Sequence, residues 1–152
     1  MAELSHDGPA SSGGILEFMS TRPARTVSIS VGRDPGAAYA YLRDPRHLPQ
    51  WAPGFARSVH QDDDEWVVET TGRAVGIAFV AENTLGVVDH RVTGDGIDDL
   101  NPMRVIANGD GCEVLFTLFQ PTGTSDSRFR DDVRLVQSDL RTLKRVLEND
   151  AR

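Results

Sequence analysis

The feature that most constrains the fold is the stretch 124–150, TSDSRFRDDVRLVQSDLRTLKRVLEND, near the end of the chain. Its apolar residues are separated by 4, 3, 4, 3 and 4 positions, which places them on one face of an α-helix. At 1.5 Å per residue such a helix is roughly 35 Å long, enough to cross a whole sheet. The stripe consists of Phe129, Val133, Val136, Leu140, Leu143 and Leu147.

The residues before this helix predict antiparallel strands. TVSISV, at 26–31, alternates apolar and polar side chains, which is the period of a strand with one buried face. From Phe55 onward short apolar runs alternate with turn residues, and NGDG between two such runs indicates a hairpin. Together these runs predict six to seven strands, at 26–31, 55–61, 65–70, 74–80, 86–92, 102–107 and 112–119.

Two short helices are expected between the first strand and the second. Asp34 precedes Pro35, and an N-cap followed by proline at the first helical position is a typical helix start. Asp44 and Pro45 repeat this signal. The prolines that follow limit the second helix to a turn or two.

This order of elements resembles the helix-grip fold of the START-like superfamily, also called SRPBCC, over about residues 25–149. Two segments carry the local resemblance, DPRHLPQWAPGF and NPMRVIANGDGCEVLFTLF, and they look most like bacterial members of uncharacterised role. The resemblance implies an α+β fold in which a curved antiparallel sheet grips the terminal helix over a cavity for an apolar or amphipathic small molecule. The superfamily includes carriers, receptors and polyketide cyclase/dehydrase-like proteins, so it does not choose a reaction.

Composition narrows the class of protein further. The length suits one domain, assigned to 25–149, and residues 1–24 are expected to be a flexible N-terminal tail or a remnant of protein expression. An apolar patch from Ile15 to Met19 could dock on the domain or on a neighbouring chain. The net charge of −7 argues against a nucleic-acid partner, and no apolar run is long enough to span a membrane. A cytoplasmic location is therefore expected.

The sequence GVVDHRV invites the hypothesis of a catalytic pair, because Asp89 stands beside His90. Successive side chains on a strand point to opposite faces, so the two cannot enter one cavity without a bulge. Asp89 is expected to sit in water beside Arg91. His90 shares its face with Val88 and Val92, which is the better candidate for the concave side.

The predicted ligand site combines apolar walls with one polar contact from His90. A histidine satisfied by a neighbouring side chain is the alternative for that residue. Asn101 or Arg104 could orient a polar ligand end, but a solvated turn that includes Asp98 and Asp99 is favoured. The residues predicted to line the site are Trp51, Phe79, His90, Met103, Phe116, Phe129 and Val133.

The leading functional hypothesis is binding of a small hydrophobic molecule. The first alternative is a polyketide-type aromatase, cyclase or dehydratase that uses His90 as its acid or base, and the second is a dimerising interaction module without a ligand. No phosphate-binding loop, nucleophile elbow or pair of histidines at metal-ligand spacing occurs in the sequence, so neither a metal nor a cofactor is predicted.

Overall fold

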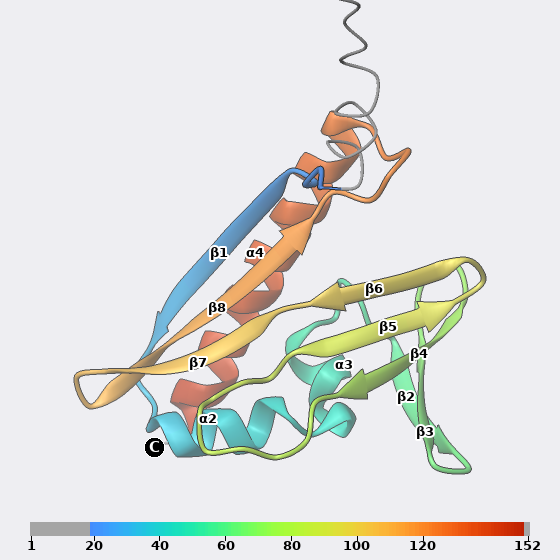
Figure 1. Ribbon diagram of the computed structural model, residues 1–152. Coiled ribbons are helices and arrows are strands. Elements are labelled where there is room, and N and C mark those ends of the chain that lie inside the picture. The colour runs from blue at the N-terminus through green and yellow to red at the C-terminus, as the bar shows by residue number, and fades with distance from the viewer. Residues whose placement is uncertain (1–18, 151–152) are drawn as a thin grey trace, which may run out of the picture.

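The computed structural model describes residues 19–150, and Figure 1 shows how its helices and strands are arranged. The helices are α2 (Pro35–Leu42), η1 (Pro45–His47), α3 (Leu48–Trp51) and α4 (Asp126–Asp150). The strands are β1 (Ala24–Val31), β2 (Ser58–Asp62), β3 (Glu65–Glu69), β4 (Ala74–Phe79), β5 (His90–Gly94), β6 (Ile97–Asn101), β7 (Met103–Asn108) and β8 (Gly111–Phe119).

The strands form two antiparallel sheets that diverge from each other. One sheet has the order β1-β8-β7, and the other has the order β2-β3-β4-β5-β6. Pro102 alone separates β6 from β7, so the chain passes directly from one sheet to the other at this point. Helix α4 runs along the β1-β8 side, while the short helices lie between the two sheets near one end (Figure 1).

The long terminal helix is confirmed, and its C-terminal half is fixed to β1. Leu140, Leu143 and Leu147 are almost completely buried. The Lys144 ammonium donates to the Ser30 carbonyl at 2.8 Å. The Glu148 carboxylate accepts from the backbone N–H of Gly32, also at 2.8 Å. This half of α4 is therefore part of a closed core.

The predicted starts of the short helices are also confirmed. The Asp34 carboxylate accepts from the backbone N–H of Ala37 at 3.0 Å, and Asp44 caps the next helix through the N–H of Arg46 at 3.0 Å. Proline follows each capping aspartate and fixes the first helical φ angle. Helix α3 follows η1 directly, has no side-chain cap of its own and ends at Trp51.

The predicted strand 86–92 was only partly right. β5 begins at His90, and the backbone of residues 86–88 pairs with β7 instead of continuing the β4-β5 ladder. The N–H of Val88 donates to the Met103 carbonyl at 2.9 Å, and the N–H of Val105 donates to Gly86 at 2.8 Å. A Cβ at Gly86 would lie 2.1 Å from the Val105 carbonyl oxygen, and its φ is +71°, so this crossover requires glycine.

The prediction of a solvated turn at Asp98 and Asp99 was wrong. Ile97–Asn101 forms strand β6, paired with β5, and it adds a strand to the six or seven that were expected. The sequence IDDLN has no hydrophobic alternation, because the face that turns inward carries Asp99 and Asn101.

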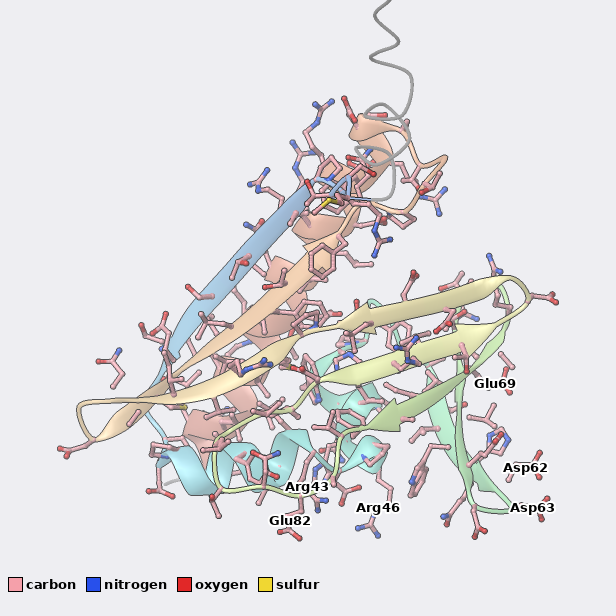
Figure 2. All side chains as sticks on the ribbon, in the orientation of Figure 1. Arg43, Arg46, Asp62, Asp63, Glu69 and Glu82 are labelled. Carbon is pink, nitrogen blue, oxygen red and sulfur yellow. The ribbon has the colours of Figure 1, made fainter. Side chains whose placement is uncertain are left out.

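Other polar turns agree with the sequence. Asp62 and Asp63 stand at the tip of the β2-β3 hairpin and are exposed (Figure 2). The apolar patch predicted from Ile15 lies outside the described residues except for Met19, which is 73% exposed. Within residues 19–150, no helix is long and apolar enough to cross a membrane.

Candidate functional site

A cavity of about 250 Å³ lies between the N-terminal half of α4, helix α3 and the two sheets. Its walls are mainly aromatic and aliphatic, with a few polar side chains among them, as is usual for small-molecule sites. The lining residues are Leu48, Trp51, Ala52, Gly54, Phe55, His90, Val92, Asp99, Asn101, Phe116, Leu118, Phe119, Pro121, Phe129, Asp132, Leu135, Val136 and Asp139.

Helix α4 contributes to this cavity through one half only. Its lining residues lie between Phe129 and Asp139, whereas Leu140, Leu143 and Leu147 belong to the closed core. β6 pairs with β5 but not with β8, so the sheets separate beside the N-terminal half of the helix. The divergence of the sheets thus leaves one half of the apolar stripe beside a cavity.

His90 reaches the cavity from the first residue of β5 and is 6% exposed. Its Nδ1 lies 3.2 Å from the Val88 carbonyl oxygen, and because a carbonyl only accepts, Nδ1 carries the proton. The ring packs between Phe79 and Phe116, with centroid distances of 5.0 and 5.7 Å. Desolvation lowers the pKa of His90, outweighing the opposing effects of the Val88 bond and the Asp89 charge. His90 is therefore a neutral imidazole whose Nε2 has a lone pair.

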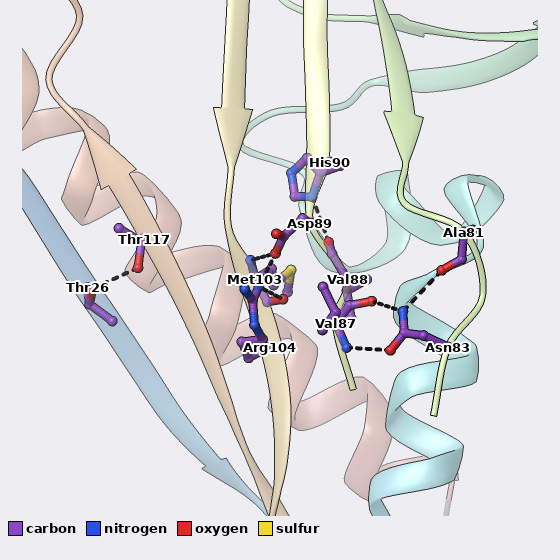
Figure 3. A network of polar contacts seen from close by, with 10 residues as sticks. All are labelled: Thr26, Ala81, Asn83, Val87, Val88, Asp89, His90, Met103, Arg104 and Thr117. Carbon is purple, nitrogen blue, oxygen red and sulfur yellow. Dashed lines mark hydrogen bonds and ion pairs between the residues drawn. The ribbon is translucent and has the colours of Figure 1, made fainter. Parts of the chain in front are cut away.

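Asp89 does not share this site and does not sit in water as expected. Its side chain is 17% exposed and forms an ion pair with Arg104. It also accepts from the backbone N–H of Met103 at 2.9 Å (Figure 3). Arg91 instead pairs with Asp98. Asp89 therefore joins the residues before β5 to the start of β7, and it has a structural role.

Two carboxyl groups of α4 face the cavity. Asp139 is 6% exposed, and its Oδ1 accepts from the backbone N–H of Gly54 at 3.1 Å. Desolvation raises the pKa of Asp139, and the Gly54 bond opposes this only in part. Desolvation also raises the pKa of Asp132, where the positive charge of Arg128 acts in the opposite direction. Both carboxyl groups are therefore harder to ionise than a solvated aspartate.

The end of α3 supplies a polar group that has no partner. The indole Nε1 of Trp51 is buried and donates to no acceptor within residues 19–150. Trp51 itself is 3% exposed and lines the cavity. A buried N–H without an acceptor costs about 1–3 kcal/mol.

The structure brings together four of the seven residues predicted to form the site, namely Trp51, His90, Phe116 and Phe129. Phe79 packs against the His90 ring, but it does not line the cavity. Met103 and Val133 are core residues, 1% and 4% exposed, and do not line the cavity.

Sequence reasoning missed the acidic residues of the site. Asp132, Val136, Asp139 and Leu143 are spaced by 4, 3 and 4, the same helical period as the apolar stripe, so the two aspartates lie beside it. That spacing was a readable signal for an acidic margin on the helix. No comparable signal marks Asp99, because its strand was not recognised.

Comparisons with known proteins agree with this architecture. Residues 23–148 match the family model described as "Polyketide cyclase / dehydrase and lipid transport". A comparison with curated proteins finds no match.

Several solved structures share the fold at low sequence identity. An uncharacterised protein from Bacillus thuringiensis superposes with a TM-score of 0.69 at 13% identity, over 82% of this chain and 98% of that one. A START superfamily protein from Mycobacterium smegmatis gives 0.63 at 10% identity, over 83% and 97%. The Aha1 dimer from Colwellia psychrerythraea gives 0.66 at 14% identity, over 83% and 96%. These likenesses show the fold alone.

Proposed function

The chain belongs to the polyketide cyclase/dehydrase and lipid transport family, and from this premise we propose that it binds a small amphipathic molecule in the cavity beside α4. The observation that carries the proposal is the cavity itself, about 250 Å³ in volume, with apolar walls and a few polar groups. A packed core contains few voids larger than a water molecule, so a space of this size is not ordinary packing.

The cavity lining offers such a ligand both apolar surface and polar contacts. Phe116, Phe119 and Phe129 supply apolar surface, while Asn101 and the Nε2 of His90 supply hydrogen-bonding capacity. A molecule that is apolar over most of its length and polar at one end suits this distribution.

A bulky substitution on the helix tests this site. Val136→Trp places an indole in the cavity, and binding of the neutral fluorescent probe N-phenyl-1-naphthylamine should fall at least about tenfold. Val146→Trp is the matched control, because Val146 lies on the same helix but not in the cavity lining. Circular dichroism checks that both variants fold. Equal probe binding by the two folded variants would place the ligand elsewhere.

A second candidate function is acid-base catalysis on a polyketide-like substrate. It is favoured by the presence in one cavity of a histidine whose pKa is lowered and an aspartate, Asp139, whose pKa is raised. Environments that shift the pKa values of two titrating groups in opposite directions are typical of acid-base sites. The neutral imidazole of His90 would accept a proton at Nε2, and the protonated carboxyl of Asp139 would donate one.

Native mass spectrometry of protein purified from its own host separates the two functions. A small molecule that is retained and released unchanged supports binding. A molecule that is converted on incubation, with conversion abolished in His90→Asn, supports catalysis instead.

A further inference from the structure

We propose that the cavity selects amphipathic ligands that carry a protonated amine, in preference to neutral ligands or carboxylates. This inference rests on the proposed binding function and names the chemical class of its ligand. It is drawn from the charges that line the cavity, from the burial of Asp139 and from the unpartnered indole N–H of Trp51.

The cavity lining carries acidic side chains and no arginine or lysine. Its ionisable groups are Asp99, Asp132, Asp139 and the imidazole of His90. Because burial favours the neutral form of His90, this residue supplies no positive charge near neutral pH. Arg128 acts on Asp132 but is not part of the lining. A ligand carboxylate would therefore enter a cavity whose lining holds acidic side chains and no cation.

Asp139 is the group that would anchor the amine. Gly54 satisfies its Oδ1, and no arginine, lysine or histidine within residues 19–150 forms an ion pair with its carboxylate. Leaving a buried carboxylate without a counter-ion is costly, and a partner of opposite charge removes much of that cost. A ligand ammonium beside the second oxygen of Asp139 would be that partner. A raised pKa, as at Asp139, is expected for a buried carboxyl group that has no partner of opposite charge.

The aromatic walls suit a cation as well. Aromatic rings attract a cation held over their faces, most strongly where water is excluded. The rings that line the cavity belong to Trp51, Phe55, Phe116, Phe119 and Phe129. A ligand ammonium in this cavity would thus have aromatic rings as well as carboxyl groups in the surrounding walls.

Trp51 adds an independent indication of a ligand. Its Nε1–H is buried without an acceptor in the described part of the chain, and Trp51 is 97% removed from solvent, being 3% exposed. Gly54, whose N–H donates to Asp139, follows Trp51 by three residues in the chain, and Trp51, Gly54 and Asp139 all line the cavity. The buried indole N–H thus marks unmet hydrogen-bonding capacity among the residues that line the cavity.

The test compares three probes that share one alkyl chain: octylamine, octan-1-ol and octanoate. Isothermal titration calorimetry at pH 7 should give the tightest dissociation constant for octylamine, by on the order of tenfold over octan-1-ol, with octanoate weakest. Equal affinities, or tightest binding of octanoate, would overturn the amine preference and leave the binding function intact. Absence of binding by all three probes would count against both proposals.

Asp139→Asn makes the test specific, because asparagine keeps an oxygen for the Gly54 N–H and loses the charge. It should abolish the preference for octylamine over octan-1-ol, measured as the ratio of the two dissociation constants. Asp110→Asn is the control, since it makes the same charge change in the exposed β7-β8 turn. If Asp139→Asn does not fold, Asp132→Asn should reduce the preference in the same direction. A folded Asp139→Asn or Asp132→Asn protein that retains the full preference would refute the assignment.

Discussion

Replacing Asp89 with alanine should destabilise the fold by about 3 kcal/mol, although Asp89 lies outside the cavity. Asp89 accepts from the backbone N–H of Met103 at 2.9 Å and pairs with Arg104. These contacts connect the residues just before β5 to the start of β7, where the chain crosses between the two sheets (Figure 3). Loss of the carboxylate would remove both contacts at once.

The magnitude follows from the burial of each partner. Met103 is 1% exposed, so its N–H would be left without an acceptor, at a cost of about 1–3 kcal/mol. The side chain of Arg104 is 41% exposed, so the ion pair adds at most about 1 kcal/mol. In a domain of this size, 3 kcal/mol corresponds to a fall in melting temperature of roughly 6–12 °C.

Asp89→Asn is the matched control, because the amide oxygen can still accept from Met103 while the charge is lost. It should cost only about 1 kcal/mol. Urea denaturation followed by circular dichroism measures both values, with unchanged m-values showing that the two states are comparable. If the two substitutions destabilise the protein equally, the ion pair and not the backbone contact holds the crossover. A cost below about 0.5 kcal/mol for Asp89→Ala would refute the structural role.

Three further predictions concern the same fold. Gly86→Ala should destabilise the protein by at least about 2 kcal/mol in the same assay, because its φ is +71° and the added Cβ meets the Val105 carbonyl, whereas Gly72→Ala, with open space around it, should change stability by less than about 0.5 kcal/mol. Leu143→Ala should cost about 3–5 kcal/mol, since Leu143 is fully buried on the inner face of α4 and its truncation leaves a cavity. The pKa of His90 is lowered in the folded state, so its contribution to stability is present above about pH 6.5 and is lost as the pH falls below that value. Urea denaturation at pH 7.5 and at pH 5.5 measures this effect. The free energy of unfolding should fall less between the two pH values for His90→Asn than for the original protein.

The sequence was sufficient to predict the architecture where a periodic pattern and an end signal coincide. The apolar stripe in α4 consists of six residues at regular helical spacing. Asp34 before Pro35 marks a helix start independently of tertiary contacts. At β6 neither signal exists. IDDLN becomes a strand because β5 offers its unpaired edge, and that pairing depends on residues far from the segment itself.

The same distinction explains which part of the site was predictable. Alternation around His90 depends only on strand geometry, and it correctly placed Val88, His90 and Val92 on one buried face. Alternation cannot show what lies on the other side of a strand, so it assigned Asp89 to water where β7 in fact supplies a backbone N–H and an arginine.

The buried aspartate in α4 shows why composition is a poor guide to a cavity. Composition alone would predict that Asp139 is a solvated residue on the polar face of the helix. Only its helical spacing relative to Val136 and Leu143 places it beside the apolar stripe. Its environment is decided by Gly54, whose missing side chain allows close packing: an added Cβ there would lie 2.6 Å from Leu135 and 3.0 Å from the Asp139 carboxylate. The chemistry of the cavity thus depends on a glycine from the loop after α3 as much as on the acidic residue it holds.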